Sequence, residues 1–263
     1  MTPNLSVIIP CFNSETLIPS TLESVFTQTY QDFEIIVIDD ESTDQTVSLL
    51  KSYGNKIRFY QQEHLGVSAA RNLGTFHARG QWIQYLDSDD LLLPHAFEHR
   101  LKMAQGKNFD RTVIYSGWKK WIEVQPGKYQ EGGTVKKALT DFHADSDLAI
   151  FSGFWCPPVA VLYPLEIVKK IGTWNESLPI IQDARFMLDA ALQGADFQFT
   201  HDVDSLYRVP LNPSLSRRHP NLFALDIYRN AQDMLMFWNI NSALDQDRYK
   251  AVVGCFEYTA REP

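Results

Sequence analysis

Trp82-Ile83-Gln84-Tyr85-Leu86-Asp87-Ser88-Asp89-Asp90 joins an apolar run to an acidic cluster. The run predicts a buried strand, and the cluster follows at its carboxyl end. In an extended backbone residues i and i+2 point the same way, so Asp87 and Asp89 can direct two carboxylates at one spot. That pair suits Mg²⁺ or Mn²⁺, which take oxygen ligands and often complete their shell with water and substrate phosphate. The segment therefore indicates an α/β protein, a transferase that uses a nucleoside diphosphate.

Short apolar runs alternate with helical patterns around this segment, which predicts βαβ units and a mostly parallel sheet flanked by helices. We expect strands over 5–10, 33–38, 56–61 and 82–86, and helices over 15–28, 44–52, 67–78 and from Pro94 onward. In open α/β sheets ligands bind beyond the carboxyl ends of the strands. Six residues fall there or at a helix start, and we expect them to share one crevice: Phe12, Asp39, Asp40, Arg71, Asp87 and Asp89.

The second half of the chain is less regular, and no repeat or Gly/Ser linker marks a boundary in it. Strands are expected within 111–122 and over 159–163, a hairpin or loop over 123–134, and helices over 165–171 and 183–193. Gly194 would close the last of these helices. From His219 onward one or two amphipathic helices are expected to pack on the sheet or on a partner.

Composition limits the class of protein to which the chain can belong and the cellular compartment in which we expect it. A formal net charge of −8 over 263 residues argues against a nucleic-acid binder, which needs basic surface. Three cysteines without Cys-x-x-Cys spacing predict buried free thiols in a reducing compartment. The N-terminal residues show no basic segment followed by a long apolar one, so we expect a cytoplasmic protein.

One apolar stretch, residues 148–168, imitates a membrane span. It contains Gly153, Pro157, Pro158 and Pro164, so we interpret it as a buried loop and strand instead. Aromatic side chains suit membrane interfaces and grooves alike, and this stretch has Phe151, Phe154 and Trp155. A peripheral contact with the inner face of the membrane through these rings stays open, as does a homodimer.

Four motifs occur in order between residues 5 and 94. They are Ser6-Val7-Ile8-Ile9-Pro10-Cys11-Phe12-Asn13, Ile38-Asp39-Asp40-Glu41-Ser42-Thr43-Asp44-Gln45-Thr46, Gly66-Val67-Ser68-Ala69-Ala70-Arg71-Asn72-Leu73-Gly74 and Asp87-Ser88-Asp89-Asp90. Together they resemble the inverting family 2 glycosyltransferases with the Rossmann-like GT-A fold. Glu41 departs from the pattern, which usually has glycine there. The resemblance implies a GT-A domain over 1–210, with a nucleotide-binding half 1–110 and an acceptor-binding half 111–210, before a helical extension over 211–263.

The resemblance also implies how a nucleotide would be bound. Asp39 and Asp40 would read the nucleoside, with one carboxylate accepting a hydrogen bond from a uracil ring nitrogen. Pro10 and Phe12 of the opening motif would lie beside it. Arg71 would lie over the base or near the diphosphate.

The metal and catalytic residues follow from the same resemblance. Asp89 would be the direct ligand of Mn²⁺ or Mg²⁺, and Asp87 would contact the metal and the ribose or donor sugar. Asp183 falls where the family has its catalytic base. The implied reaction is metal-dependent, inverting transfer from a nucleotide-diphosphate sugar, with UDP-sugars favoured, to an acceptor hydroxyl. The family's habits suggest a glycan or lipid-linked acceptor in surface polysaccharide synthesis.

Simpler roles compete with several of these. Asp183 could only cap its helix, and Arg71 could be an exposed helical residue. Arg208, Arg217 and Arg218 could close over the diphosphate, although solvated loop charge is the default. Two other functions stay open. A sugar nucleotidyltransferase would need a basic, Gly-rich loop after the first strand, which the sequence lacks, and an inactive glycan-binding module would need neither metal nor base. The donor sugar, the acceptor and the linkage are not defined by the sequence.

Overall fold

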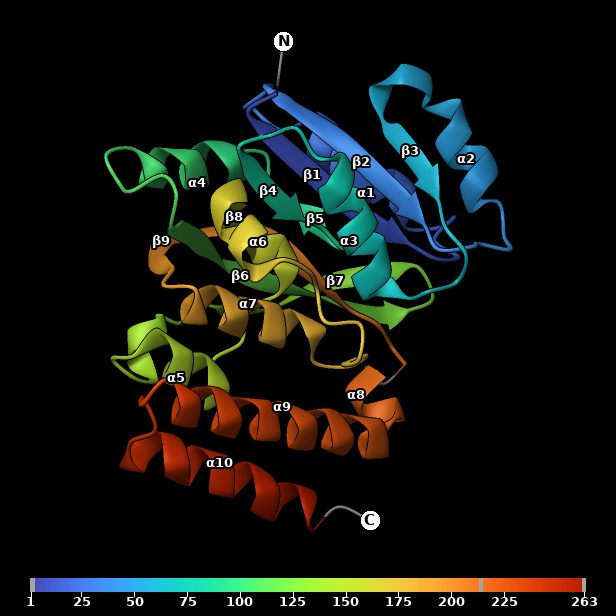
Figure 1. Cartoon of the computed structure of the whole chain (residues 1–263). Coiled ribbons are helices and arrows are strands. Elements are labelled where there is room, and N and C mark those ends of the chain that lie inside the picture. Colours follow the sequence, from blue (N-terminus) through green and yellow to red (C-terminus); the bar gives the residue numbers. More distant parts are fainter. Residues whose placement is uncertain (1–2, 213–214, 262–263) are drawn as a thin grey trace.

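A computed structural model describes residues 3–212 and 215–261. Within these residues a nine-stranded sheet has the order β3-β2-β1-β4-β8-β6-β9-β5, and β7 pairs with β6 beside this path (Figure 1). The strands are β1 Leu5–Cys11, β2 Phe33–Asp39, β3 Arg58–Gln61, β4 Trp82–Tyr85, β5 Leu91–Leu92, β6 Thr112–Gln125, β7 Lys128–Val135, β8 Val161–Pro164 and β9 Asp196–Val209.

Strands β1 to β4 form the parallel part of the sheet, as the alternating pattern predicts. Every residue of β1 is buried, which a parallel strand covered on both faces requires. The register pairs Cys11 with Asp39 and Ile8 with Tyr85. The carboxyl ends of β2, β1 and β4 therefore meet at one edge of the sheet.

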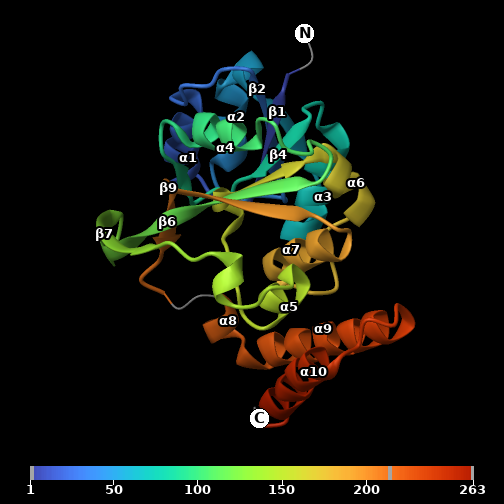
Figure 2. The ribbon, with the colours of Figure 1, turned by 90° about the vertical axis from the view of Figure 1, so that its left-hand side faces the viewer.

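Helices cover both faces of this sheet (Figures 1 and 2). Val7 and Ile9 of β1 pack in one core cluster with side chains of α1, α2 and α4, whereas Ile8 faces the opposite cluster. The helices of the first face are α1 Ile18–Phe26, α2 Thr46–Ser52 and α4 Ala96–Ala104, and those of the second are α3 Val67–His77, α6 Leu165–Ile171 and α7 Gln182–Leu192.

The C-terminal helices lie outside these layers. They are α8 Leu215–Arg218, α9 Pro220–Ile240 and α10 Gln246–Thr259, of which α9 and α10 contact the short α5 Ser146–Phe151 (Figure 1). Arg248 of α10 donates to Asp147 and Asp145 at 2.9 and 3.0 Å, which ties α10 to the start of α5. Of the two expected packing sites, the sheet is wrong, because α5 and α7 lie between α9 and the strands, whereas packing on a partner stays a prediction.

The apolar stretch over 148–168 is partly helical, since α5 extends into it before β8 and α6 follow. No helix among the described residues is long and apolar enough to cross a membrane. The three cysteines are unpaired as expected, with Cys11 and Cys156 buried and Cys255 partly so.

The long strand β9 was not expected from the sequence. Residues 201–209, interpreted as part of a charged loop, run through the sheet between β6 and β5. Asp204 is 1% exposed there, and its carboxylate lies 2.9 Å from His99 Nδ1, from which it accepts a hydrogen bond when that nitrogen carries the proton. Asp204 and Arg208 of this segment are therefore buried by partners from other elements, whereas Asp202 stays exposed.

Gly80 provides a test of the packing between β4 and β1. A Cβ atom at Gly80 would lie 2.5 Å from the backbone nitrogen of Ser6 and 2.6 Å from the carbonyl carbon of Leu5. Backbone atoms cannot yield as a flexible side chain does, so Gly80→Ala is expected to lower the free energy of unfolding by about 2 to 3 kcal/mol in urea denaturation. Gly133→Ala is the control, because no atom lies within 4 Å of its added Cβ. Equal midpoints for the two variants would contradict this packing.

Candidate active site

The acidic loop after β4 is held from both sides. Ser88 Oγ hydrogen-bonds Ser14 Oγ at 2.9 Å, and Thr21 of α1 donates to the carbonyl oxygen of Ser88 at 2.9 Å. Asp90 is 1% exposed, and one of its oxygens accepts a hydrogen bond from the backbone nitrogen of Arg208 in β9. The loop is thus fixed by α1 on one side and β9 on the other.

Arg71 and Asp87 form an ion pair at this loop, with 2.5 Å between Nη2 and Oδ1. The guanidinium carbon of Arg71 also lies 4.3 Å from the centre of the Trp174 ring. Arg71 is 2% exposed, so the alternative of an exposed helical residue is wrong. Its Nε and Nη1 are buried without a hydrogen-bond partner. These two guanidinium nitrogens of Arg71 can therefore donate hydrogen bonds to a ligand next to the carboxylate of Asp87.

Asp89 is the least engaged carboxylate of the loop. No hydrogen bond within the described part of the chain reaches its side chain, whereas its carbonyl oxygen accepts one from Arg208 Nη1 at 2.7 Å. Burial and the nearby charge of Asp87 raise the pKa of Asp89 to about 6. The pKa of Asp90 is raised further, chiefly by burial. Such a cluster of carboxylates favours a cation nearby.

Arg208 is buried rather than exposed in a loop, contrary to the default interpretation of its segment. Its Nη2 donates to Ser20 at 2.8 Å, and its guanidinium lies 5.1 Å from the centre of the Tyr129 ring in β7. Its Nε is buried without a partner. Arg217 and Arg218 lie in α8, away from this strand.

The carboxyl ends of β1 and β2 form the other end of the site. Asp40 accepts hydrogen bonds from Gln62 at 2.7 Å and from the backbone nitrogens of Leu65 and Gly66 at 2.9 and 3.0 Å. These bonds fix the loop before α3. Asp39 is completely buried, and it accepts a hydrogen bond from the backbone nitrogen of Ser42 at 3.2 Å.

An open aromatic pair borders Asp40. Phe12 is 44% exposed, and its ring lies 4.4 Å from that of His64, centre to centre. His64 Nδ1 lies 3.0 Å from a carboxylate oxygen of Asp40. Glu41, which replaces the usual glycine, keeps a left-handed backbone with φ of 65°, and its carboxylate accepts from the backbone nitrogen of His64. The turn geometry is therefore retained without glycine.

Pro10 lies inside β1, buried and paired in register with Ile38 of β2. Proline cannot donate to a neighbouring strand and is unusual in a central one. It fits here because β4 pairs with β1 only over Leu5–Ile8. At Pro10 the strand β1 is therefore no longer paired with β4, two residues before Phe12.

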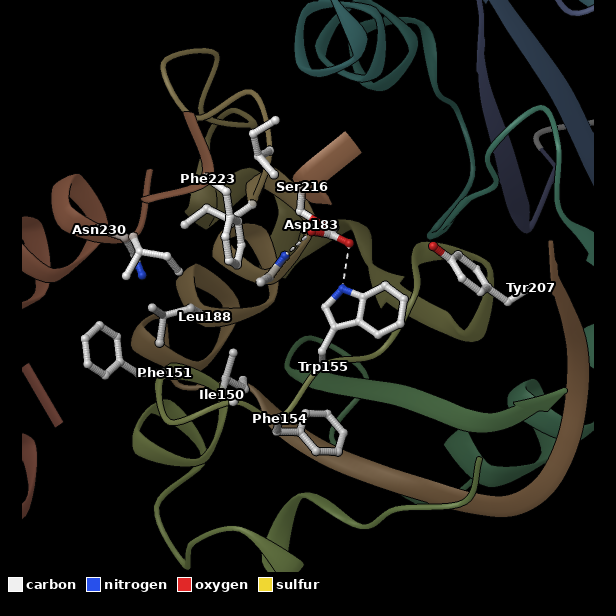
Figure 3. Close-up of a pocket in the computed structure, with 15 residues that line it drawn as sticks. Ile150, Phe151, Phe154, Trp155, Asp183, Leu188, Tyr207, Ser216, Phe223 and Asn230 are labelled. Carbon is white, nitrogen blue, oxygen red and sulfur yellow. Dashed lines mark hydrogen bonds between the residues drawn. The ribbon is translucent and has the colours of Figure 1, made fainter. Parts of the chain in front are cut away.

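Asp183 lies in the first turn of α7, one residue after the start of the helix. The residue preceding the helix is Ile181, so Asp183 is not the N-cap that the simpler interpretation proposed. Its Oδ2 accepts a hydrogen bond from Trp155 Nε1 at 2.7 Å, and its Oδ1 accepts one from the backbone nitrogen of Ala184 (Figure 3). Burial raises the pKa of Asp183, while the hydrogen bond from Trp155 lowers it.

Tyr207 connects Asp183 with the acidic loop. Its ring lies 5.4 Å from that of Trp155, and its pKa is raised by burial and by the charges of Asp90, Asp183 and Asp89. Figure 3 shows Tyr207 and Trp155 on one side of Asp183. The structure thus brings Asp183, at the far end of the sequence motifs, next to the loop after β4. The sequence did not single out Trp155 or Tyr207 as partners of Asp183.

A cavity of about 420 Å³ lies beside Asp183 and is lined by Trp155 and Tyr207 as well. Its lining comes from α5 and the segment that follows it, from α7 and the two residues before it, from α9, and from one residue each of β9 and α8 (Figure 3). Phe151, Phe154 and Trp155, which were candidates for a membrane contact, lie around this cavity, and Phe154 is 1% exposed. Asp183 therefore stands between an acidic loop and a largely apolar cavity.

The donor set of the acidic loop fits a hard divalent cation bound together with a ligand. Within residues 3–212 and 215–261 no three His, Cys, Asp or Glu side chains are grouped so that they could hold a metal alone. Asp89 has carboxylate oxygens without a hydrogen bond, and Asp87 lies next to it. One or two carboxylates, completed by water and phosphate oxygens, are a common Mg²⁺ or Mn²⁺ site in nucleotide-binding proteins.

Comparison with known sequences matches this chain to glycosyltransferases. The family model described as Glycosyl transferase family 2 matches residues 6–155, more than half of the chain. A glycosyltransferase of Haemophilus influenzae is 35% identical over 213 residues, which cover 79% of this chain and 80% of that protein. A glycosyltransferase of Rickettsia bellii is 29% identical over 183 residues, or 69% of this chain. The chain spans only 26% of the length of that relative.

Solved structures share the fold. TarS residues 1–349 of S. aureus, in complex with UDP-GlcNAc, superimposes with a TM-score of 0.70 at 22% identity, over 88% of this chain and 66% of that one. Mannosyltransferase PcManGT of Pyrobaculum calidifontis, in complex with GDP-Man and Mn²⁺, gives a TM-score of 0.67 at 17% identity, over 99% of this chain and 71% of that one. At these identities the likeness concerns the fold.

Proposed function

The chain belongs to glycosyl transferase family 2 and has the GT-A fold, and on this basis we propose that it transfers a sugar from a nucleotide-diphosphate sugar to an acceptor hydroxyl. The observation that carries the proposal is the position of Asp183. Its carboxylate is held by Trp155 beside Tyr207, within electrostatic range of Arg71 and Asp87. A base at Asp183 and a diphosphate at the acidic loop would thus be adjacent, as a single displacement requires.

The nucleoside would bind at the ends of β1 and β2. Phe12 offers an exposed ring for stacking on the base, and Asp40, although only 4% exposed, borders it, whereas Asp39 is completely buried. We therefore assign base recognition to Asp40 and the support of its loop to Asp39. A UDP-sugar is the donor that agrees with the resemblance and with the UDP-GlcNAc bound by TarS.

The diphosphate would lie along the loop after β4. Asp89 and Asp87 would hold Mn²⁺ or Mg²⁺, which when bound neutralises the charge of the leaving nucleoside diphosphate. Arg71 has two buried donors without partners and lies beside Asp87, so it can bind the donor sugar or a phosphate oxygen. PcManGT, which binds Mn²⁺, supports a divalent metal here.

Asp183 would act as the general base. It removes the proton from the acceptor hydroxyl while that oxygen attacks the anomeric carbon, and the nucleoside diphosphate leaves from the opposite face. The configuration at that carbon is inverted. Trp155 keeps the carboxylate oriented, and the N-terminal turn of α7 stabilises its ionised form.

The remaining assignments follow the family resemblance. We assign residues 1–210 to the transferase domain and 211–263 to a helical extension. The acceptor would be a glycan or a lipid-linked sugar of surface polysaccharide synthesis, used at the cytoplasmic face of the membrane. A homodimer and a peripheral membrane association belong to this proposal as well.

The direct test is release of UDP from a panel of UDP-sugars with Mn²⁺, compared with GDP-mannose. Acceptor-independent hydrolysis of at least one UDP-sugar, with inversion detected by NMR of the released sugar, is the expected result. Retention of the anomeric configuration would contradict the role of Asp183. Failure to cleave any nucleotide sugar would contradict the transferase.

The pH profile of this reaction tests the contact between Trp155 and Asp183. The base must be ionised, and burial raises its pKa, so the acidic limb of the kcat/KM profile is expected above the ordinary aspartate pKa of about 3.9. Trp155→Phe removes a hydrogen bond that lowers this pKa. Its acidic limb is therefore expected at higher pH than that of the wild type, with a rate about tenfold lower on the plateau.

Trp121→Phe is the matched control for this profile. Trp121 lies in β6, stacks on Tyr129 and makes no contact with Asp183. Its acidic limb should coincide with that of the wild type. An unshifted limb in Trp155→Phe would show that this hydrogen bond does not control the base.

A further inference from the structure

The cavity beside Asp183 has walls that the proposed reaction leaves unexplained. α9 contributes Phe223 and Ile227, α7 contributes Leu188, and Phe151 ends α5. In Figure 3 Leu188, Phe151 and Phe223 lie on the side of Asp183 opposite to Tyr207. Tyr207, which lies toward the acidic loop, lines the cavity at one end, and the cavity extends from there past Asp183 to α9. It therefore lies where the part of the acceptor beyond its reacting hydroxyl would be.

The polar groups of this cavity are few. Among the lining residues Asp183 is the single charged side chain. Trp155, Tyr207, Ser216 and Asn230 add polar atoms, of which Trp155 Nε1 donates to Asp183 and the carbonyl oxygen of Asn230 accepts a hydrogen bond from Arg185 at 3.2 Å. The hydroxyls of an oligosaccharide placed against Leu188 and Ile227 would lose water without gaining partners. An alkyl chain would bury apolar surface there at no such loss.

We propose that the acceptor carries an alkyl group next to its reacting hydroxyl, and that this group occupies the cavity between α5, α7 and α9. The proposal rests on the proposed function, since Asp183 orients the acceptor. A volume of about 420 Å³ is within the range of small-molecule sites, which are mostly apolar with a few polar groups. The helical extension thereby becomes part of the acceptor site, because α9 forms one wall.

The test compares methyl and hexyl glycosides of the same sugars. Glucosides, galactosides, N-acetylglucosaminides and mannosides are titrated below micellar concentrations into protein saturated with UDP and Mn²⁺, and binding is followed by calorimetry. The hexyl glycosides are expected to bind at least about tenfold more tightly than the methyl glycosides, because the additional methylene groups leave water.

Two substitutions of the same kind on α9 locate the site. Ile227→Asn places an amide in the cavity wall and is expected to lower the hexyl preference at least about threefold. Ile240→Asn makes the same change at a residue that is 73% exposed on this helix and should keep the preference. Ile227→Phe, which fills the cavity without adding polarity, is a second variant and should also reduce hexyl binding. UDP affinity in each variant reports on the fold.

The outcomes separate this inference from the transferase. Three results would overturn the alkyl site: equal binding of methyl and hexyl glycosides, no binding of either, or a hexyl preference that neither substitution of Ile227 changes. If the protein still binds UDP, the proposed transferase function would stand in each of these cases. A hexyl preference that depends on Ile227 in a protein that binds no nucleotide would support the alkyl site and overturn the transferase.

Discussion

Replacement of Asp183 by asparagine is expected to reduce sugar transfer about a thousandfold while UDP affinity stays the same. Asparagine keeps the size of the side chain, and its carbonyl oxygen can still accept the hydrogen bond from Trp155 Nε1. What it loses is the ability to take a proton, and removal of a general base typically costs about 10² to 10⁴ in rate. Transfer rates and UDP calorimetry on the same preparation measure the two quantities.

Asp32→Asn is the control for this substitution, because it makes the same change of charge at an exposed residue. It should leave both quantities unchanged. An Asp183→Asn variant with wild-type turnover would remove Asp183 from the chemistry. A variant that lost UDP affinity and turnover together would point to a role in donor binding instead.

Asp89→Asn is expected to abolish the metal-dependent part of nucleotide binding and to lower turnover about 100- to 1000-fold. Within residues 3–212 and 215–261 no other residue donates a hydrogen bond to the carboxylate of Asp89, so the main partner that it would lose is the cation. Titration of UDP with increasing Mn²⁺ measures the effect, and circular dichroism with thermal unfolding checks the fold.

The direction in which Asp89→Asn changes thermal stability can be predicted. Burial and the charge of Asp87 raise the pKa of Asp89, so its ionised form is unfavourable in the protein without metal. The asparagine variant should therefore be at least as stable as the wild type near neutral pH. Unchanged dependence of UDP binding on Mn²⁺ in this variant would contradict the assignment of Asp89 as a metal ligand.

The parallel half of the fold could be predicted from the sequence because its signals are local. Apolar runs of four to seven residues mark strands that are buried on both faces, and polar residues follow each one. The parallel register then places Asp39 and the loop after β4 at one edge, without any knowledge of side-chain contacts. The GT-A fold and the family are confirmed by the comparisons.

The antiparallel half depends on contacts that are distant in sequence. β9 contains Asp204 and Arg208, and the charge of Arg208 suggested a loop. They are buried because Arg100 and His99 of α4 lie beside Asp204, and because the acidic loop lies beside Arg208. No pattern within 196–209 reports such partners, which belong to elements about a hundred residues earlier.

The same reason explains what was missed at the candidate site. Trp155 is 28 residues from Asp183, and only the packing of its ring against Trp118 and Tyr207 aims Nε1 at the carboxylate. Trp174 likewise meets Arg71 across about a hundred residues of sequence. Motifs identified the groups that could do chemistry, whereas the tertiary structure determines which groups orient them.

Calorimetric binding of UDP with Mn²⁺, repeated with excess EDTA and with GDP, CDP and dTDP, tests the central claim most directly. The expected result is UDP binding that requires the metal and exceeds that of the other nucleotides, because Asp40 would read the base and Asp89 would hold the cation. Absence of binding for every nucleoside diphosphate with Mn²⁺ present, or UDP binding that EDTA does not weaken, would contradict the claim of a metal-dependent nucleotide-sugar transferase.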